Sequence, residues 1–302
     1  MLRARGGPLA GLGDAAAVDG LLGLLDGDER RWLSLFRRMG IAGRAAVVDL
    51  AGTEAGRAPL GRGSGGDTTI LLDRAAENAI LATLLREAPA PYSAVSEESG
   101  QVGDVDARWR LLIDPVDGSL NAKRGLDPFS LAIAASRGEL IADVSLGYIM
   151  DYTSGHEYAA AAGRGFVAGR SVSRPPDDRV ELILLESGRP GARHFDYADL
   201  AAIAGEAGAG VRVRQVGSLA LCLCYVSLGI ADLLLAPVRS RAVDIAAGLL
   251  MVEESGGGAG ALDGTDLWAQ PLDLQRRAPF IAWRAGLDPA RLLSWGRRIT
   301  SD

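Results

Sequence analysis

An apolar run that ends in two aspartates constrains this chain more than any other feature. Residues 112–121 read Leu-Ile-Asp-Pro-Val-Asp-Gly-Ser-Leu-Asn. We predict a strand that ends before Asp114 and a turn at Pro115, because proline fixes φ as the chain leaves the strand. Such a turn directs the carboxylates of Asp114 and Asp117 at one hard cation, for which oxygen ligands are preferred.

The two residues that follow favour an anion. A glycine at 118 allows backbone N–H groups to approach a phosphate closely, and a helix that starts near Ser119 adds its positive end. The alternative interpretation is a strand followed by an Asx turn, in which Asp and Gly serve only as turn formers.

Three further acidic segments have the same character. Glu97 and Glu98 end a short apolar approach, and two adjacent carboxylates repel each other unless a cation is near. Asp244 directly precedes the apolar helical run 245–254, and Asp73 precedes a run with helical spacing. Helix N-capping alone also explains the last two aspartates. Together, however, the acids supply enough oxygen ligands for two or three divalent ions.

These segments carry a resemblance to a known family. The pattern consists of Asp73 with Glu77, residues 96–98, residues 114–121, residues 243–248 and residues 254–257. In order and separation it resembles the inositol monophosphatase family over residues 61–283. It is most similar to the branch that hydrolyses both inositol monophosphate and fructose 1,6-bisphosphate.

The resemblance implies a fold and cofactors. The expected fold is α+β and α/β, a layered α-β-α-β-α sandwich of the sugar phosphatase type. Two or three Mg²⁺ ions are the expected cofactors, with Mn²⁺ as a substitute. The expected partner is a small phosphorylated substrate, and a homodimer is common in the family.

The resemblance also implies residue roles. The implied metal ligands are Glu97, Asp114, the carbonyl of Val116, Asp117 and Asp244. The implied catalytic residues are Asp73, Glu97 and Ser119, which orient the attacking water. The implied substrate-binding residues are Asp117, Gly118, Ser119, Gly217, Ser218 and Arg241. Two interpretations of Arg241 are open. Its guanidinium binds a sugar hydroxyl or a second phosphate through two N–H groups, or the residue is a solvated surface arginine.

Three functions are compatible with these residues. The first is Mg²⁺-dependent hydrolysis of inositol 1-phosphate, fructose 1,6-bisphosphate or both, by a metal-activated water. The alternative is a phosphatase for 3'-phosphoadenosine 5'-phosphate, from a neighbouring branch with the same metal motif. The third is a non-catalytic phosphosugar-binding protein.

Composition excludes other classes. A net charge of −6 argues against nonspecific binding to nucleic acid or an anionic membrane. Cys222 and Cys224 are the two cysteines, so neither a disulfide framework nor a four-cysteine zinc site is available, and we expect a reducing cytoplasm. Asp14 and Asp19 interrupt the amino-terminal segment, which argues against a signal peptide. Residues 219–237 are apolar, but we interpret them as a buried helix that leads into a strand.

Periodicity and breakers predict two lobes. An α+β metal-binding lobe with a largely antiparallel sheet is expected over 1–176, and an α/β lobe over 177–302. The first contains predicted helices at 14–39 and 73–86, a strand at 45–50, a mobile glycine-rich loop at 52–66, strands at 93–96, 109–113, 131–136 and 143–149, and a hairpin at 163–165. A linker is expected at 174–178. The second contains predicted strands at 182–186, 211–216 and 232–235, and helices at 198–207, 218–228 and 245–254.

Overall fold

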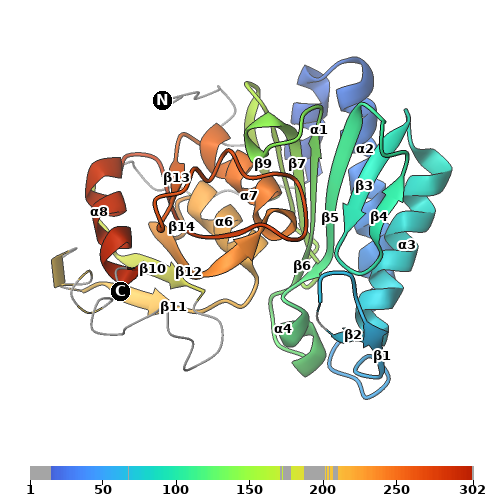
Figure 1. The fold of residues 1–302 in the computed structure, drawn as a ribbon, viewed down its shortest axis with the longest axis horizontal. Helices are drawn as coiled ribbons and strands as arrows, with labels where there is room; N and C mark the ends of the chain where they lie inside the picture. Colours follow the sequence, from blue (N-terminus) through green and yellow to red (C-terminus); the bar gives the residue numbers. More distant parts are fainter. Residues whose placement is uncertain are drawn as a thin grey trace.

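Helices and sheets alternate in five layers in the computed structural model of this chain (Figure 1). The structure describes residues 15–66, 68–170, 172, 178–186, 201, 203, 205–206 and 210–300. Within this part, three apolar clusters fill the spaces between the successive layers.

The first layer is helical. It holds α1 (Ala15–Leu24), α2 (Gly27–Val47) and α3 (Leu71–Glu87). Buried residues of α2 recur at helical spacing, at Trp32, Phe36, Met39, Gly43 and Val47. One face of this helix therefore packs inward and the other is left to charged residues.

The second layer is a seven-stranded sheet. Its strands are β3 (Tyr92–Ser96), β4 (Gly100–Gly103), β5 (Trp109–Asp117), β6 (Ser130–Ser136), β7 (Val144–Asp151), β8 (Glu157–Ala161) and β9 (Gly165–Ala168). They lie in the order β4-β3-β5-β6-β7-β8-β9, and all neighbours are antiparallel except β3 and β5. Because helices cover both faces, β6 is buried along its whole length.

The third layer consists of α6 (Leu219–Ser227) and α7 (Ala242–Glu254), which lie between the two sheets (Figure 1). Small residues allow this close packing. A Cβ on Gly147 of β7 would lie 2.8 Å from the carbonyl oxygen of Ala247, and one on Gly248 would lie 2.5 Å from a methyl carbon of Leu223. The helix that carries Asp244 is therefore held against both the seven-stranded sheet and α6.

The fourth layer is a five-stranded mixed sheet, and α8 (Pro289–Thr300) packs on its outer face. The strands are β10 (Leu182–Leu185), β11 (Arg212–Arg214), β12 (Leu233–Arg241), β13 (Gly258–Ala261) and β14 (Arg277–Trp283). Their order is β11-β10-β12-β14-β13, with β10 parallel to both of its neighbours. Strands β13 and β14 and helix α8 were not predicted from the sequence.

Short elements complete the fold. They are a hairpin of β1 (Pro59–Arg62) and β2 (Thr68–Ile70), the six-residue helix α4 (Ser119–Arg124) and the 3-10 helix η1 (Ile141–Asp143). Strand β1 lies within residues 52–66, for which a loop is predicted, and β2 follows that segment. That loop therefore contains paired strand structure, and its mobility stays a prediction.

The layered sandwich and the largely antiparallel first sheet are confirmed. The apolar segment 219–237 consists of α6 followed by β12, as predicted. Among the described residues, no helix is both long and apolar enough to cross a membrane.

The strand predicted at 45–50 is wrong, because α2 continues to Val47 and turns follow. Ala45 and Ala46 favour helix, and Val47 lies four residues after the buried Gly43, on the same helix face. Three other predictions fall wholly or mainly outside the described residues: the linker at 174–178, the helix at 198–207 and the lobe boundary at 176. The division into two lobes therefore stays a prediction.

Candidate functional site

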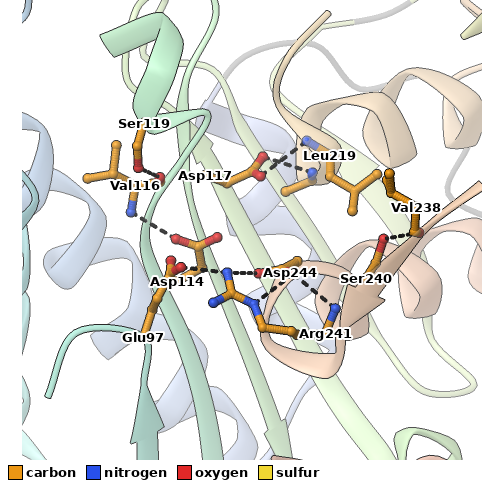
Figure 2. Close-up of polar contacts among 11 residues, drawn as sticks. Glu97, Asp114, Val116, Asp117, Ser119, Leu219, Val238, Ser240, Arg241 and Asp244 are labelled. Atoms are coloured by element: carbon orange, nitrogen blue, oxygen red, sulfur yellow. Dashed lines mark hydrogen bonds and ion pairs between the residues drawn. The ribbon is translucent and has the colours of Figure 1, made fainter. Parts of the chain in front are cut away.

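Three carboxylates from three different elements meet at one point. Glu97 lies in the turn between β3 and β4, Asp114 on β5 and Asp244 in the first turn of α7. Each offers one oxygen, and these oxygens lie within 4.8 Å of one another (Figure 2). We call Glu97, Asp114 and Asp244 the carboxylate trio.

The Asp-Pro-Val-Asp segment is a bulge in a strand rather than a turn after it. β5 continues to Asp117, and its register with β6 shifts between Asp114 and Asp117. The turn predicted at Pro115 is therefore wrong. A proline lacks the N–H needed for regular pairing and is accommodated at a bulge. The backbone N–H of Val116 donates to Oδ1 of Asp114 at 3.0 Å, which fixes that carboxylate.

Asp73 and Asp244 occupy equivalent positions at the starts of two helices. The predicted helices begin at Asp73 and at Ile245, whereas each aspartate is the third residue within its helix. Asp73 accepts the backbone N–H of Ile70 at 3.2 Å, and Asp244 accepts that of Arg241 at 3.0 Å. These bonds satisfy an N–H at each helix start. Among the described residues, Oδ1 of Asp73 has no hydrogen-bond partner, whereas Oδ1 of Asp244 accepts from the guanidinium of Arg241.

Burial makes the carboxylates of this region costly to ionise. It raises the pKa of Asp114 well above its usual value, and the charges of Glu97 and Asp117 raise it further. Burial also raises the pKa of Asp73 to about 7, with smaller contributions from Glu98 and Glu97. The pKa of Glu97 is likewise raised by burial, which outweighs the opposing effect of Arg241. The site therefore favours a cation.

Asp117 lies outside the carboxylate trio. Its carboxylate accepts the backbone N–H of Leu219 at 3.1 Å (Figure 2). It also accepts the backbone N–H of Ala220 at 2.9 Å and the hydroxyl of Ser218. It thus joins the end of β5 to the start of α6. Burial raises the pKa of Asp117 to about 7, and these hydrogen bonds oppose that shift. Its predicted role as a metal ligand stays a prediction.

The residues expected to hold phosphate are brought together from two distant segments. Gly118 has a φ of +91°, and a Cβ there would lie 2.9 Å from the carbonyl oxygen of Gly217. The side chain of Asn121 joins the same two segments by donating to the carbonyl of Val216 at 2.8 Å. Ser119 donates its hydroxyl to the carbonyl of Val116 at 2.8 Å. The hydroxyl of Ser119, a predicted catalytic group, thus contacts the carbonyl of Val116, a predicted metal ligand.

Arg241 is not a surface arginine. Its side chain is 11% exposed, and its guanidinium donates to Glu97 and to both oxygens of Asp244 (Figure 2). The interpretation as a solvated residue is therefore wrong. Glu98, which we paired with Glu97 in the sequence, instead accepts the hydroxyl of Thr69 on β2.

Two glutamates, one half-buried and one fully buried, support the site and have no role assigned from the sequence. Glu186 follows β10 and accepts the backbone N–H of Gly217 at 2.8 Å. Glu77 of α3 is fully buried and accepts the hydroxyl of Ser96 and both the backbone N–H and the hydroxyl of Ser99. Glu77 sits four residues after Asp73, on the same helix face, and that spacing was the available signal.

Glu77→Ala is expected to lower turnover at this site by about 10- to 100-fold, because the two serines that flank Glu97 and Glu98 lose their acceptor. Steady-state kinetics over a range of Mg²⁺ concentrations checks this, and the apparent affinity for Mg²⁺ should fall as well. Glu87→Ala is the matched control on the same helix, since Glu87 pairs with Arg38 and Arg86 near the surface. Unchanged kinetics in a folded Glu77→Ala chain contradict the proposed support.

The donor set fits a hard divalent cation. The trio offers only oxygen atoms, which Mg²⁺ prefers. Near it, Oδ1 of Asp73 is buried and has no hydrogen-bond partner among the described residues. Three largely buried carboxylates this close together need compensating positive charge, and the guanidinium of Arg241 supplies a single positive charge.

Comparison with known proteins agrees with this geometry. The family model described as the inositol monophosphatase family matches residues 41–289. The chain is 30% identical to a fructose-1,6-bisphosphatase/inositol-1-monophosphatase of Archaeoglobus fulgidus, over 88% of this chain and 98% of the relative. It is 32% identical to an inositol-1-monophosphatase of Aeropyrum pernix, over 82% of this chain and 88% of that one.

The fold is also similar to solved structures. The crystal structure of the MJ0109 gene product, an inositol monophosphatase-fructose 1,6-bisphosphatase, superposes with a TM-score of 0.71. That match covers 87% of this chain and 99% of the other at 23% identity, which is a likeness of fold.

Proposed function

The chain belongs to the inositol monophosphatase family and is a phosphoric monoester hydrolase, and on this premise we propose that it hydrolyses inositol 1-phosphate, fructose 1,6-bisphosphate or both with Mg²⁺. The observation that carries the proposal is the carboxylate trio, whose three oxygens lie within 4.8 Å of one another. The names of the relatives support sugar phosphates as the substrate class.

The residues divide into ligands and positioning groups in this proposal. Glu97, Asp114 and Asp244 would hold the cation, with the carbonyl of Val116 and the carboxylate of Asp117 as further ligands. When bound, Mg²⁺ supplies neutralisation of the phosphoryl oxygens and lowers the pKa of water, which are the needs of in-line displacement.

The remaining groups act on water and phosphate. Asp73 would accept a proton from the attacking water at Oδ1, which has no hydrogen-bond partner among the described residues, and Ser119 would orient that water. The backbone of Gly118 and Ser119 would bind phosphoryl oxygens, with Gly217 and Ser218 on the facing segment. Burial of the carboxylates excludes bulk water and so strengthens each of these interactions. Assembly as a homodimer stays a prediction.

Phosphate release is the test. Inositol 1-phosphate, fructose 1,6-bisphosphate and adenosine 3',5'-bisphosphate are each supplied with Mg²⁺ or with EDTA. We expect Mg²⁺-dependent release from one or both sugar phosphates and none in EDTA. A preference for the adenosine bisphosphate would move the chain to the nucleotide branch. Binding of Mg²⁺ without release from any ester would support the non-catalytic alternative, and undiminished release in EDTA would contradict metal dependence.

A further inference from the structure

Arg241 occupies the oxygens that a divalent ion needs. We propose that its guanidinium is an internal counter-cation of the carboxylate trio, and that a divalent ion displaces it from Glu97 and Asp244. This inference rests on the proposed function, because it assumes that the trio is the metal site. It assigns Arg241 a role in metal loading, in addition to the substrate contact predicted from the sequence.

The guanidinium and a cation draw on the same atoms. Nη2 of Arg241 donates to Oε1 of Glu97 and, at 2.8 Å, to Oδ1 of Asp244, while Nε donates to Oδ2 of Asp244 at 3.1 Å. Both carboxylates belong to the trio. All three side chains are at most 14% exposed, so the charges interact with little screening by solvent. A divalent ion placed among these oxygens would lie close to the guanidinium, and like charges at that range repel strongly.

The carboxylates keep their places without the guanidinium. Oδ2 of Asp244 also accepts the backbone N–H of Arg241 at 3.0 Å, which any residue at 241 except proline preserves. Glu97 is held through its backbone, since its N–H donates to Ile113 at 3.2 Å and its carbonyl accepts from Gly65 at 2.7 Å. When a divalent ion displaces the guanidinium, the positive charge beside the trio changes but its carboxylates stay in place.

The guanidinium is incompletely satisfied in its present position. Its Nη1 is buried and, among the described residues, has no hydrogen-bond partner. It lies beneath the turn of the β1–β2 hairpin, where a Cβ on Gly65 would be 2.5 Å from it. An unpaired buried donor costs free energy, so the two ion pairs keep the side chain there. Once a cation binds the oxygens of Glu97 and Asp244, the guanidinium is free to bind an anionic group of the substrate.

Binding of Mn²⁺ to the full-length chain at pH 8, followed by electron paramagnetic resonance, tests the competition. We expect Arg241→Gln to bind Mn²⁺ at least about tenfold more tightly than the wild type, because the repelling charge is gone. Arg241→Lys keeps one charge and should stay nearer to the wild type. In EDTA, the melting temperature of Arg241→Gln should fall, and Mn²⁺ should raise it by more than in the wild type.

Arg37→Gln is the matched control. Arg37 also pairs with two carboxylates, Asp19 and Glu157, neither of which belongs to the trio. Its loss should leave the affinity for Mn²⁺ unchanged. Equal or weaker binding by Arg241→Gln, in a chain whose wild type binds Mn²⁺, overturns the displacement but leaves the proposed function intact. No binding by either chain overturns both. Binding by Arg241→Gln alone supports the displacement and contradicts the proposed function.

A measurement on the wild type covers the case in which Arg241→Gln does not fold. The Nε–H resonance of Arg241 in a ¹⁵N-labelled chain is assigned by its absence from Arg241→Lys. We expect this resonance to shift and to exchange faster with solvent when Mg²⁺ is added, since its bond to Asp244 breaks. A resonance that neither moves nor loses protection at saturating Mg²⁺ contradicts the displacement.

Discussion

Asp114→Asn is expected to lower Mg²⁺-dependent phosphate release by at least about a thousandfold, which corresponds to about 4 kcal/mol of transition-state stabilisation. Asp114 is the member of the trio whose carboxylate is buried in the sheet itself. The amide has the same shape and still accepts the N–H of Val116, but it brings no negative charge to the cation. We therefore expect Asp114→Asn to lose activity because the cation loses a charged ligand, while the chain stays folded.

The melting temperature of Asp114→Asn distinguishes a loss of metal binding from a loss of folding. Burial raises the pKa of Asp114 well above its usual value, so the ionised form is destabilising in the metal-free chain. Asp114→Asn should then unfold in EDTA at the same temperature as the wild type or higher. Glu157→Gln is the control, a buried carboxylate-to-amide change on β8 that should keep most of the activity. If folded Asp114→Asn retains more than about a tenth of wild-type turnover, the trio is not the metal site.

Asp232→Ala is expected to lower the free energy of unfolding by about 3–5 kcal/mol, the largest stability loss that we predict. Asp232 and Arg284 form a buried ion pair, with Nε of Arg284 2.6 Å from Oδ1 of Asp232. The other carboxylate oxygen accepts the N–H groups of Glu181 at 2.6 Å and Leu182 at 2.8 Å. Removing the carboxylate leaves a buried positive charge and two N–H groups without this acceptor.

The position of the pair explains why the loss matters to the site. It joins the start of β10 to the residues next to β12 and β14, and β12 leads to Arg241 and Asp244. Urea unfolding measures the change. Asp28→Ala removes an exposed ion pair with Arg31 and should stay within about 1 kcal/mol of the wild type. If Asp232→Ala is equally mild, the ion pair does not hold the second sheet together.

Local sequence was sufficient to predict the helices and strands in which apolar residues recur with a clear period. The strands at 92–96 and 130–136 and the helices at 71–87 and 219–227 lie within two residues of their predicted bounds. Errors occurred where two signals competed. Residues 45–50 combine helix-favouring alanines with β-branched valines, and the buried face of α2 decided the outcome. Pro115 indicated a turn, but hydrogen bonds between β5 and β6 continue beyond it as a bulge.

The candidate site was predicted in its parts but not in its arrangement. The acidic segments, their order and their separation were sufficient to indicate the family, which the family match over residues 41–289 confirms. Sequence spacing could not show that Asp117 is engaged by the start of α6 while Glu97, Asp114 and Asp244 converge. Nor could it show that Glu77 supports the turn containing Glu97, since that contact crosses from a helix to a hairpin.

The sequence by itself determined which oxygen ligands exist, near which strands and helices they lie, and the family to which the chain belongs. These follow from local composition and periodicity, which act over a few residues. The tertiary structure alone decided which carboxylates share one point and which cation neutralises them. Arg241 and Glu97 are 144 residues apart in the chain, and they meet because α7 packs between the two sheets. Burial then sets the electrostatics, because the pKa of a carboxylate depends on the charges and solvent around it rather than on its neighbours in sequence.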